Sequence, residues 1–225
     1  MAVYDLDGKN IAGKDYTGKT FVTFGDSITW YDGHQQSGVD VHGYQYYLRQ
    51  IGFDVTNKGV SGASIAYHSG GYTDICETVN ATNCAGYDYA FVAGGVNDYQ
   101  SFPSDIGELA TSNYSNATVI GALQIIIEKI VTDNPDIKLF LMTPLREAYN
   151  GTNCDNPNSK GNTLGDYADA IRLVAKHYSI PVLDFNSMSG VNEVNLSTLT
   201  IDNLHLNNVG YEFVSNKLIA FVDSI

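Results

Sequence analysis

Phe21–Ser27 reads FVTFGDS, and this segment gives the clearest indication of the fold. Its first four residues are apolar or β-branched, and such a continuous run predicts a short strand that is buried on both faces. Gly25 permits a sharp turn, and Asp26 and Ser27 are residue types that start a helix. A serine on such a turn lies where open α/β sheets bind ligands. Ser27 is therefore either an exposed nucleophile or simply a helix cap.

Outward from this stretch, apolar runs and helical patterns alternate along the chain. Further strands are predicted at residues 53–57, 87–93, 138–142 and 181–185. Amphipathic spacing predicts helices at residues 43–51, 117–133, 164–178 and 208–222. Polar or loop-like segments are predicted at residues 68–86, 99–116 and 146–162, the first and last as insertions. The alternation indicates an α/β fold, with a five-stranded parallel sheet and helices on both of its faces.

Length and composition favour one substantial domain. The chain has 225 residues, of which 44% are hydrophobic. This is enough for a hydrophobic core that needs no metal ion or disulfide to stabilise it. Residues 1–20 are predicted to be an irregular lead-in or the stub of a longer chain, and residues 21–225 the domain itself. The formal net charge of −13 argues against nucleic acid and anionic membranes as partners. No window of 18 consecutive apolar residues occurs, so no membrane span is expected.

The cysteines and the N-terminal residues give information about the cellular compartment of the protein. Cys76, Cys84 and Cys154 form no CxxC pair, which argues against a zinc or thioredoxin-like site. Cys76 and Cys84 could close a small loop in an oxidising compartment, or all three could be free thiols. The first residues lack the basic start and apolar core of a signal peptide. We expect an extracellular or cell-surface location rather than a cytoplasmic one.

Two further turns at strand ends carry groups that suit acyl transfer. Gly62 lies in a glycine-rich turn, where a backbone N–H can point inward. Asn97 follows a predicted strand and two glycines, and it offers a side-chain amide donor. With the N–H of Ser27, these donors would form an oxyanion hole. The plainer alternatives are a turn role for Gly62 and a helix cap for Asn97.

A serine nucleophile needs a base, and His205 is the best candidate among the five histidines. The others lie in predicted loops or within a predicted helix: His34, His42, His68 and His177. Asp202 precedes His205 by three residues, so its carboxylate can reach the imidazole nitrogen that faces away from the serine. Such a contact fixes the tautomer of the base. The same spacing also occurs in ordinary surface pairs.

Together these blocks resemble the SGNH (GDSL-type) hydrolase superfamily. They are Gly25–Ser27, Gly62, Gly95–Asp98 and Asp202–His205, in the family's order. The resemblance implies a flavodoxin-like three-layer sandwich over residues 21–225. It also implies ester hydrolysis through a serine acyl-enzyme, with no metal and no cofactor.

The resemblance assigns a role to each matching residue. Ser27 is the nucleophile, His205 the base and Asp202 the residue that orients it. The oxyanion hole is formed by the backbone N–H groups of Ser27 and Gly62 and by the side chain of Asn97. Two departures make the substrate subgroup harder to assign, since Ala63 stands where the family often has Asp and Leu206 where it often has Pro.

The substrate is predicted from the surface chemistry. Sixteen tyrosines, Trp30 and the polar insertions favour an aromatic, wet surface that suits sugars better than long acyl chains. We therefore expect hydrolysis of short O-acyl esters, above all acetyl, on a small ester or an acylated polysaccharide. The alternatives are core positions for the tyrosines, a lipase- or lysophospholipase-type acylhydrolase, and a silent glycan-binding module of a surface or phage tail-like protein.

Overall fold

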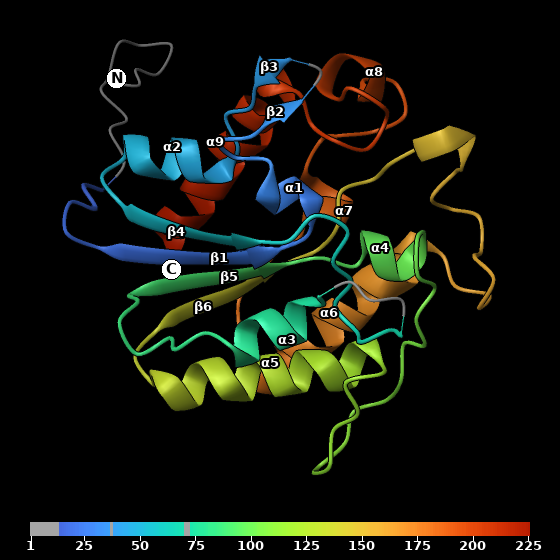
Figure 1. Cartoon of the computed structure of the whole chain (residues 1–225), viewed down its shortest axis with the longest axis horizontal. Helices are drawn as coiled ribbons and strands as arrows, with labels where there is room; N and C mark the ends of the chain where they lie inside the picture. Colours follow the sequence, from blue (N-terminus) through green and yellow to red (C-terminus); the bar gives the residue numbers. More distant parts are fainter. Residues whose placement is uncertain (1–13, 37, 70–72) are drawn as a thin grey trace.

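A five-stranded parallel sheet forms the centre of the molecule (Figure 1). The computed structural model describes residues 14–36, 38–69 and 73–225. The strands are β1 (Thr20–Gly25), β4 (Asp54–Gly59), β5 (Tyr89–Ala93), β6 (Lys138–Met142) and β7 (Val182–Leu183). They lie in the order β4-β1-β5-β6-β7, which is the flavodoxin-like order. The predicted fold class is confirmed.

Helices cover both faces of this sheet, so the fold has three layers (Figure 1). One face carries α2 (Tyr44–Gln50) and α9 (Asn208–Ser224), which pack against each other. The opposite face carries α3 (Ile75–Asn80), α5 (Val119–Asp133) and α6 (Leu164–Tyr178). The shorter elements are β2 (Gln35–Gln36), β3 (Val39–Asp40), α1 (Ser27–Trp30), α4 (Val96–Tyr99), η1 (Tyr149–Gly151), α7 (Phe185–Met188) and α8 (Leu196–Leu199). Figure 1 shows α1 and α4 at the carboxyl ends of the strands.

The central strand explains why the sheet sits in the core. β1 pairs with β4 on one side and with β5 on the other, and helices lie on both faces of the sheet (Figure 1), so the residues from Phe21 to Gly25 are all buried. The Phe21 ring lies edge-on to Phe53, Phe91 and Phe140, with ring centroids 5.1–6.1 Å apart. Such edge-to-face pairs add to the apolar burial. The continuous apolar run in the sequence is the signature of this doubly covered position.

The segment 68–86 differs from its prediction as an insertion. It contains α3, whose Ile75 and Val79 are buried against the sheet and α5. Asp74 caps this helix by accepting a hydrogen bond from the Glu77 N–H at 2.7 Å. The helix was missed because six residues give too little helical periodicity to be distinguished from a polar loop. The fifth strand is also shorter than predicted, because Phe185 begins α7.

The cysteines and tyrosines resolve two of the alternatives left by the sequence. Cys76, Cys84 and Cys154 are free and buried, so the thiol alternative holds. Among the described residues, six tyrosines are buried in the core: Tyr16, Tyr44, Tyr89, Tyr99, Tyr167 and Tyr211. The tyrosine count therefore reflects the core as well as the surface.

The residues that precede β1 are only partly described. Residues 1–13 lie outside the described part of the chain, so the predicted lead-in remains a prediction there. Tyr16 stacks on Phe53 with ring centroids 4.2 Å apart, and its hydroxyl donates to the Asp223 carboxylate at 2.8 Å. The described part of the chain contains no helix that is long and apolar enough to cross a membrane.

Candidate active site

The turn after β1 holds Ser27 at the start of α1. The Asp26 carboxylate accepts a hydrogen bond from the Ile28 N–H at 2.9 Å and thereby caps this helix. Gly25 is required here, because a Cβ at this position would lie 2.1 Å from Thr29 Oγ1 and 2.8 Å from the Ala93 carbonyl oxygen. The absence of a side chain lets α1 fold back tightly against β1. Ser27 is thus fixed at the carboxyl edge of the sheet.

Ser27 faces the imidazole of His205, although the two residues are 178 positions apart. Ser27 Oγ lies 2.9 Å from His205 Nε2, and His205 Nδ1 lies 2.7 Å from Asp202 Oδ2. The other Asp202 oxygen accepts the backbone N–H of His205 at 2.8 Å. One carboxylate therefore holds both the ring and the main chain of the histidine. The three residues form a continuous hydrogen-bonded line that ends on the serine hydroxyl.

The two remaining predicted site residues lie on neighbouring segments. Gly62 has a positive φ of 81°, and in the described part of the chain its N–H has no backbone acceptor. Asn97 lies in α4, and its amide donates one hydrogen to the Ala63 carbonyl at 2.9 Å. The second amide hydrogen remains available to another acceptor. Ser27 is the first residue of α1, so its N–H has no acceptor within that helix.

Asp98 ties the Gly62 turn to α4. Its buried carboxylate accepts hydrogen bonds from the Ile65 N–H at 2.7 Å and from the Ala66 N–H at 3.0 Å. Burial raises the pKa of Asp98 to about 6, against the lowering effect of these two bonds. The two segments that carry Gly62 and Asn97 are therefore held in a fixed relation by one side chain.

Two tyrosines beside the histidine were not predicted. The rings of Tyr31 and Tyr149 lie edge-on to His205, with centroid distances of 5.2 and 6.2 Å. Tyr31 lies one helical turn after Ser27, a spacing that could have revealed it. Tyr149 comes from the segment predicted as an insertion, where no pattern marks it. The buried Glu147 carboxylate accepts the Tyr149 N–H at 2.6 Å and holds that segment in place.

Three other histidines, His34, His42 and His177, have surroundings that differ from those of His205. His34 stacks on Trp30 with centroids 3.6 Å apart, and His42 stacks on Tyr46 at 4.0 Å. His177 lies in α6, the helix predicted for it, and is exposed. The two positions that depart from the family pattern, Ala63 and Leu206, are both fully buried. Within residues 14–36, 38–69 and 73–225, no group of three or more His, Cys, Asp or Glu is placed to hold a metal ion.

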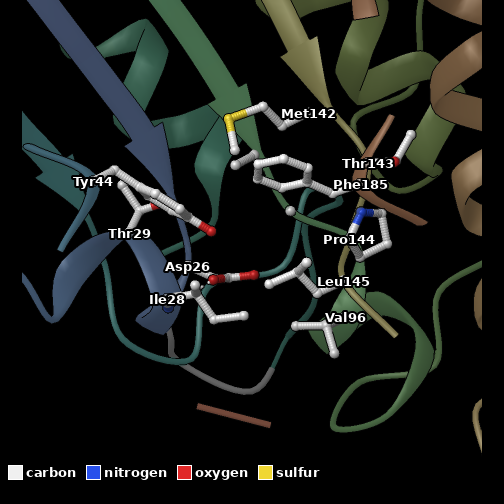
Figure 2. Close-up of a pocket in the computed structure, with 12 residues that line it drawn as sticks. Asp26, Ile28, Thr29, Tyr44, Val96, Met142, Thr143, Pro144, Leu145 and Phe185 are labelled. Carbon is white, nitrogen blue, oxygen red and sulfur yellow. Dashed lines mark hydrogen bonds between the residues drawn. The ribbon is translucent and has the colours of Figure 1, made fainter. Parts of the chain in front are cut away.

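A small cavity lies between the Asp26 turn and the ends of β5 and β6 (Figure 2). Its volume of about 20 Å³ is room for one water molecule. Figure 2 shows the Tyr44 hydroxyl pointing toward the Asp26 carboxyl group. Thr29 Oγ1 is buried, lines the same cavity and has no hydrogen-bond partner among the described residues. Burial raises the pKa of Asp26 to about 6, while the Ile28 N–H and nearby His205 act in the opposite direction.

The buried Asp26 predicts a pH-dependent stability. Its native pKa of about 6 lies above its ordinary value of 3.8, so the native state holds the proton more tightly than the unfolded state. Stability should therefore rise as the pH falls through about 6 toward 4. Asp26→Asn keeps an acceptor for the Ile28 N–H but cannot titrate. We therefore compare the free energy of unfolding of the wild type with that of the variant. The wild-type value minus the variant value should increase by about 1.5 kcal/mol when the pH is lowered from about 7 to about 5.

Urea unfolding of both proteins across that pH range measures the difference. Asp98, whose pKa is also raised, is present in both proteins, so its own contribution largely cancels. Parallel stability curves would mean that Asp26 is ionised in the native state throughout.

Comparison with known proteins places this geometry in a family. The model of the GDSL-like lipase/acylhydrolase family matches residues 23–213. One solved structure is 28% identical, with a TM-score of 0.82, and the match covers 94% of this chain and 99% of the other. A protein from Lactobacillus plantarum is 24% identical, with a TM-score of 0.79 and coverage of 92% and 98%. Among curated protein sequences, none matches significantly.

More distant structures share the fold. A carbohydrate acetylesterase from Sinorhizobium meliloti is 13% identical, with a TM-score of 0.65 and coverage of 92% and 99%. The family match spans the Ser27 turn, the Gly62 turn, α4 and the His205 segment, and so includes every predicted site residue. The hydrogen-bonded serine, histidine and aspartate are the groups that such an enzyme needs. The chain belongs to the GDSL-like lipase/acylhydrolase family and is an SGNH-type serine hydrolase.

Proposed function

We propose that this enzyme is an esterase that removes short acyl groups, above all acetyl, from carbohydrate. The observation that carries its chemistry is the hydrogen-bonded line from Ser27 through His205 to Asp202. A serine hydroxyl is a weak nucleophile until a base accepts its proton, and His205 Nε2 is within reach to do so. Asp202 keeps the opposite nitrogen protonated and stabilises the imidazolium that forms.

The reaction follows in two steps. Ser27 Oγ attacks the ester carbonyl carbon while its proton moves to His205 Nε2, and the carbonyl oxygen becomes an oxyanion. The oxyanion collapses, the bond to the alcohol oxygen breaks, and His205 returns its proton to the leaving alcohol. Water then gives a proton to His205 and attacks the acyl-serine carbonyl. Collapse of the second oxyanion releases the carboxylic acid and restores the Ser27 hydroxyl.

Asn97→Ala should lower kcat by about a hundred- to a thousand-fold, because one donor to the oxyanion is lost. The same change removes the hydrogen bond to the Ala63 carbonyl. Asn97→Asp is the matched variant, since it keeps the size of the side chain but replaces the donor by an acceptor. Steady-state kinetics on p-nitrophenyl acetate measure both. A kcat within roughly a factor of ten of the wild type for Asn97→Ala would remove this residue from the oxyanion hole.

The preference for a carbohydrate ester is supported by the aromatic side chains beside His205. The tyrosines beside His205 supply aromatic surface with polar tips, which suits a sugar alcohol. The same fold carries a carbohydrate acetylesterase in Sinorhizobium meliloti.

We expect kcat/KM for p-nitrophenyl acetate to exceed that for p-nitrophenyl octanoate by roughly tenfold or more, since each additional methylene must find space. Both esters are assayed with the wild type, and acetylated oligosaccharides are assayed alongside by release of acetate. Faster hydrolysis of octanoate would move the assignment to a lipase-type acylhydrolase. No hydrolysis of any ester would favour a glycan-binding module.

A further inference from the structure

An open groove lies beyond the active-site turns and takes no part in the chemistry described above. It has a volume of about 400 Å³ and is lined by Tyr67, His68, Phe102, Pro103, Asp105 and Lys160, among others. This volume falls within the range of sites that bind small molecules. We call it the Tyr67 groove.

The groove is a continuation of the two segments that carry the oxyanion donors. Tyr67 follows Gly62 by five positions, so their Cα atoms are at most ~18 Å apart. Phe102 lies one turn beyond Asn97, whose carbonyl accepts the Phe102 N–H at 2.8 Å. Asp98 joins the two segments between these points. The groove is therefore lined by residues of the same two segments that carry Gly62 and Asn97.

The walls of the groove combine aromatic faces with polar groups. Tyr67 is 50% exposed, and its backbone N–H is fixed by the Asn116 carbonyl at 2.8 Å. The rings of His68 and Phe102 stack in parallel, with centroids 3.7 Å apart. At the rim Lys160 forms an exposed ion pair with Asp105 at 3.0 Å.

This chemistry matches a sugar ring. Aromatic faces pack on the C–H surface of a pyranose, while charged and hydroxyl groups at the edge bond its hydroxyls. A long acyl chain offers no hydrogen-bonding group to the polar rim, so it gains less there than a sugar does. The formal net charge of −13 disfavours an anionic polysaccharide. A neutral glycan fits best.

We propose that the Tyr67 groove binds a neutral saccharide unit next to the acylated one, so that the enzyme acts on oligosaccharides rather than on isolated sugars. The inference rests on the proposed function for the position of the acyl group, which is at Ser27. The groove is then a specificity-determining subsite, and it contributes to binding without touching the reacting atoms.

The kinetic test compares Tyr67→Ala with Phe213→Ala, a control that removes a 36% exposed aromatic ring on α9. Lys160→Met is a second exposed variant at the groove rim. For Tyr67→Ala we expect KM on acetylated xylo-, manno- or gluco-oligosaccharides to rise about tenfold with little change in kcat. Lys160→Met should raise the same KM by a smaller factor. Hydrolysis of p-nitrophenyl acetate should stay within roughly a factor of two for all three variants.

A binding test separates this inference from the proposed function. Ser27→Ala is titrated calorimetrically with the three deacetylated oligosaccharides, with and without Tyr67→Ala. Loss of binding on Tyr67→Ala supports the groove even if the wild type hydrolyses no ester. Hydrolysis of acetylated oligosaccharides with a KM that Tyr67→Ala leaves unchanged overturns the groove and leaves the esterase in place. Absence of binding to every oligosaccharide, with p-nitrophenyl acetate still hydrolysed, also overturns it.

Discussion

Ser27→Ala is expected to lower kcat for p-nitrophenyl acetate by about a million-fold, the scale of nucleophile removal in triad hydrolases. Without the hydroxyl no acyl-enzyme forms, and only the oxyanion donors and substrate binding can still assist attack by water. The fold should survive, because Ser27 Oγ bonds only to His205 among the described side chains. Burst kinetics of the wild type and steady-state rates of the variant measure the effect.

A covalent probe gives an independent reading of the same residue. An aryl fluorophosphonate should modify Ser27 in the wild type and leave Ser27→Ala unmodified, as seen by mass spectrometry of the peptide. Ser224→Ala serves as the control, since Ser224 is an exposed serine at the end of α9 whose hydroxyl donates to the Phe221 carbonyl. Substantial turnover by Ser27→Ala, or labelling at another serine, would contradict the assignment of Ser27 as the nucleophile.

Asp202→Asn should lower kcat by about ten-thousand-fold with little change in fold. The asparagine oxygen can still accept the His205 backbone N–H, which Asp202 holds at 2.8 Å. The amide group would then face the ring nitrogen and donate to it. The proton of the neutral ring would move to the nitrogen that faces Ser27, and that nitrogen could no longer accept the serine proton.

The matched control for this change is Asp40→Asn, an exposed carboxylate on β3 that accepts a bond from Gln35. It removes the same charge and should leave kcat within roughly a factor of two. If Asp202→Asn retained more than about a tenth of the wild-type kcat, the carboxylate would not be setting the tautomer of His205.

The sequence predicted best those elements whose local signals agree with their packing. The α6 helix has the predicted bounds, because its apolar spacing is regular and Thr163 forms a capping box with Asp166. β6 likewise matches its predicted range. The short helices at the carboxyl edge of the sheet were harder to predict, since their conformation depends on helix caps and on the neighbouring strands. The helix α3, on one face of the sheet, was missed for a similar reason, because its cap Asp74 gives only a weak signal in the sequence.

For the site, position along the chain was more informative than local pattern. Ser27, Gly62 and Asn97 could be named as candidates because each follows a strand, and parallel strands end at the same edge. Tyr149 could not be found, because its place beside His205 depends on the path of an irregular segment held by the buried Glu147. The raised pKa of Asp26 was equally hidden, since burial is a property of the assembled fold.

The separation of Ser27 from His205 by 178 residues has a consequence for synthesis. The serine leaves the ribosome early, but the histidine that faces it, its proposed base, is made only with the last part of the chain. That part is anchored by the Tyr211 hydroxyl, which donates to the Ile28 carbonyl at 2.6 Å, and by Asn208, which accepts the His42 N–H at 2.9 Å. A nascent or divided chain would therefore carry an unactivated serine. Ester hydrolysis would report when the C-terminal segment docks, which suits the enzyme to fragment complementation.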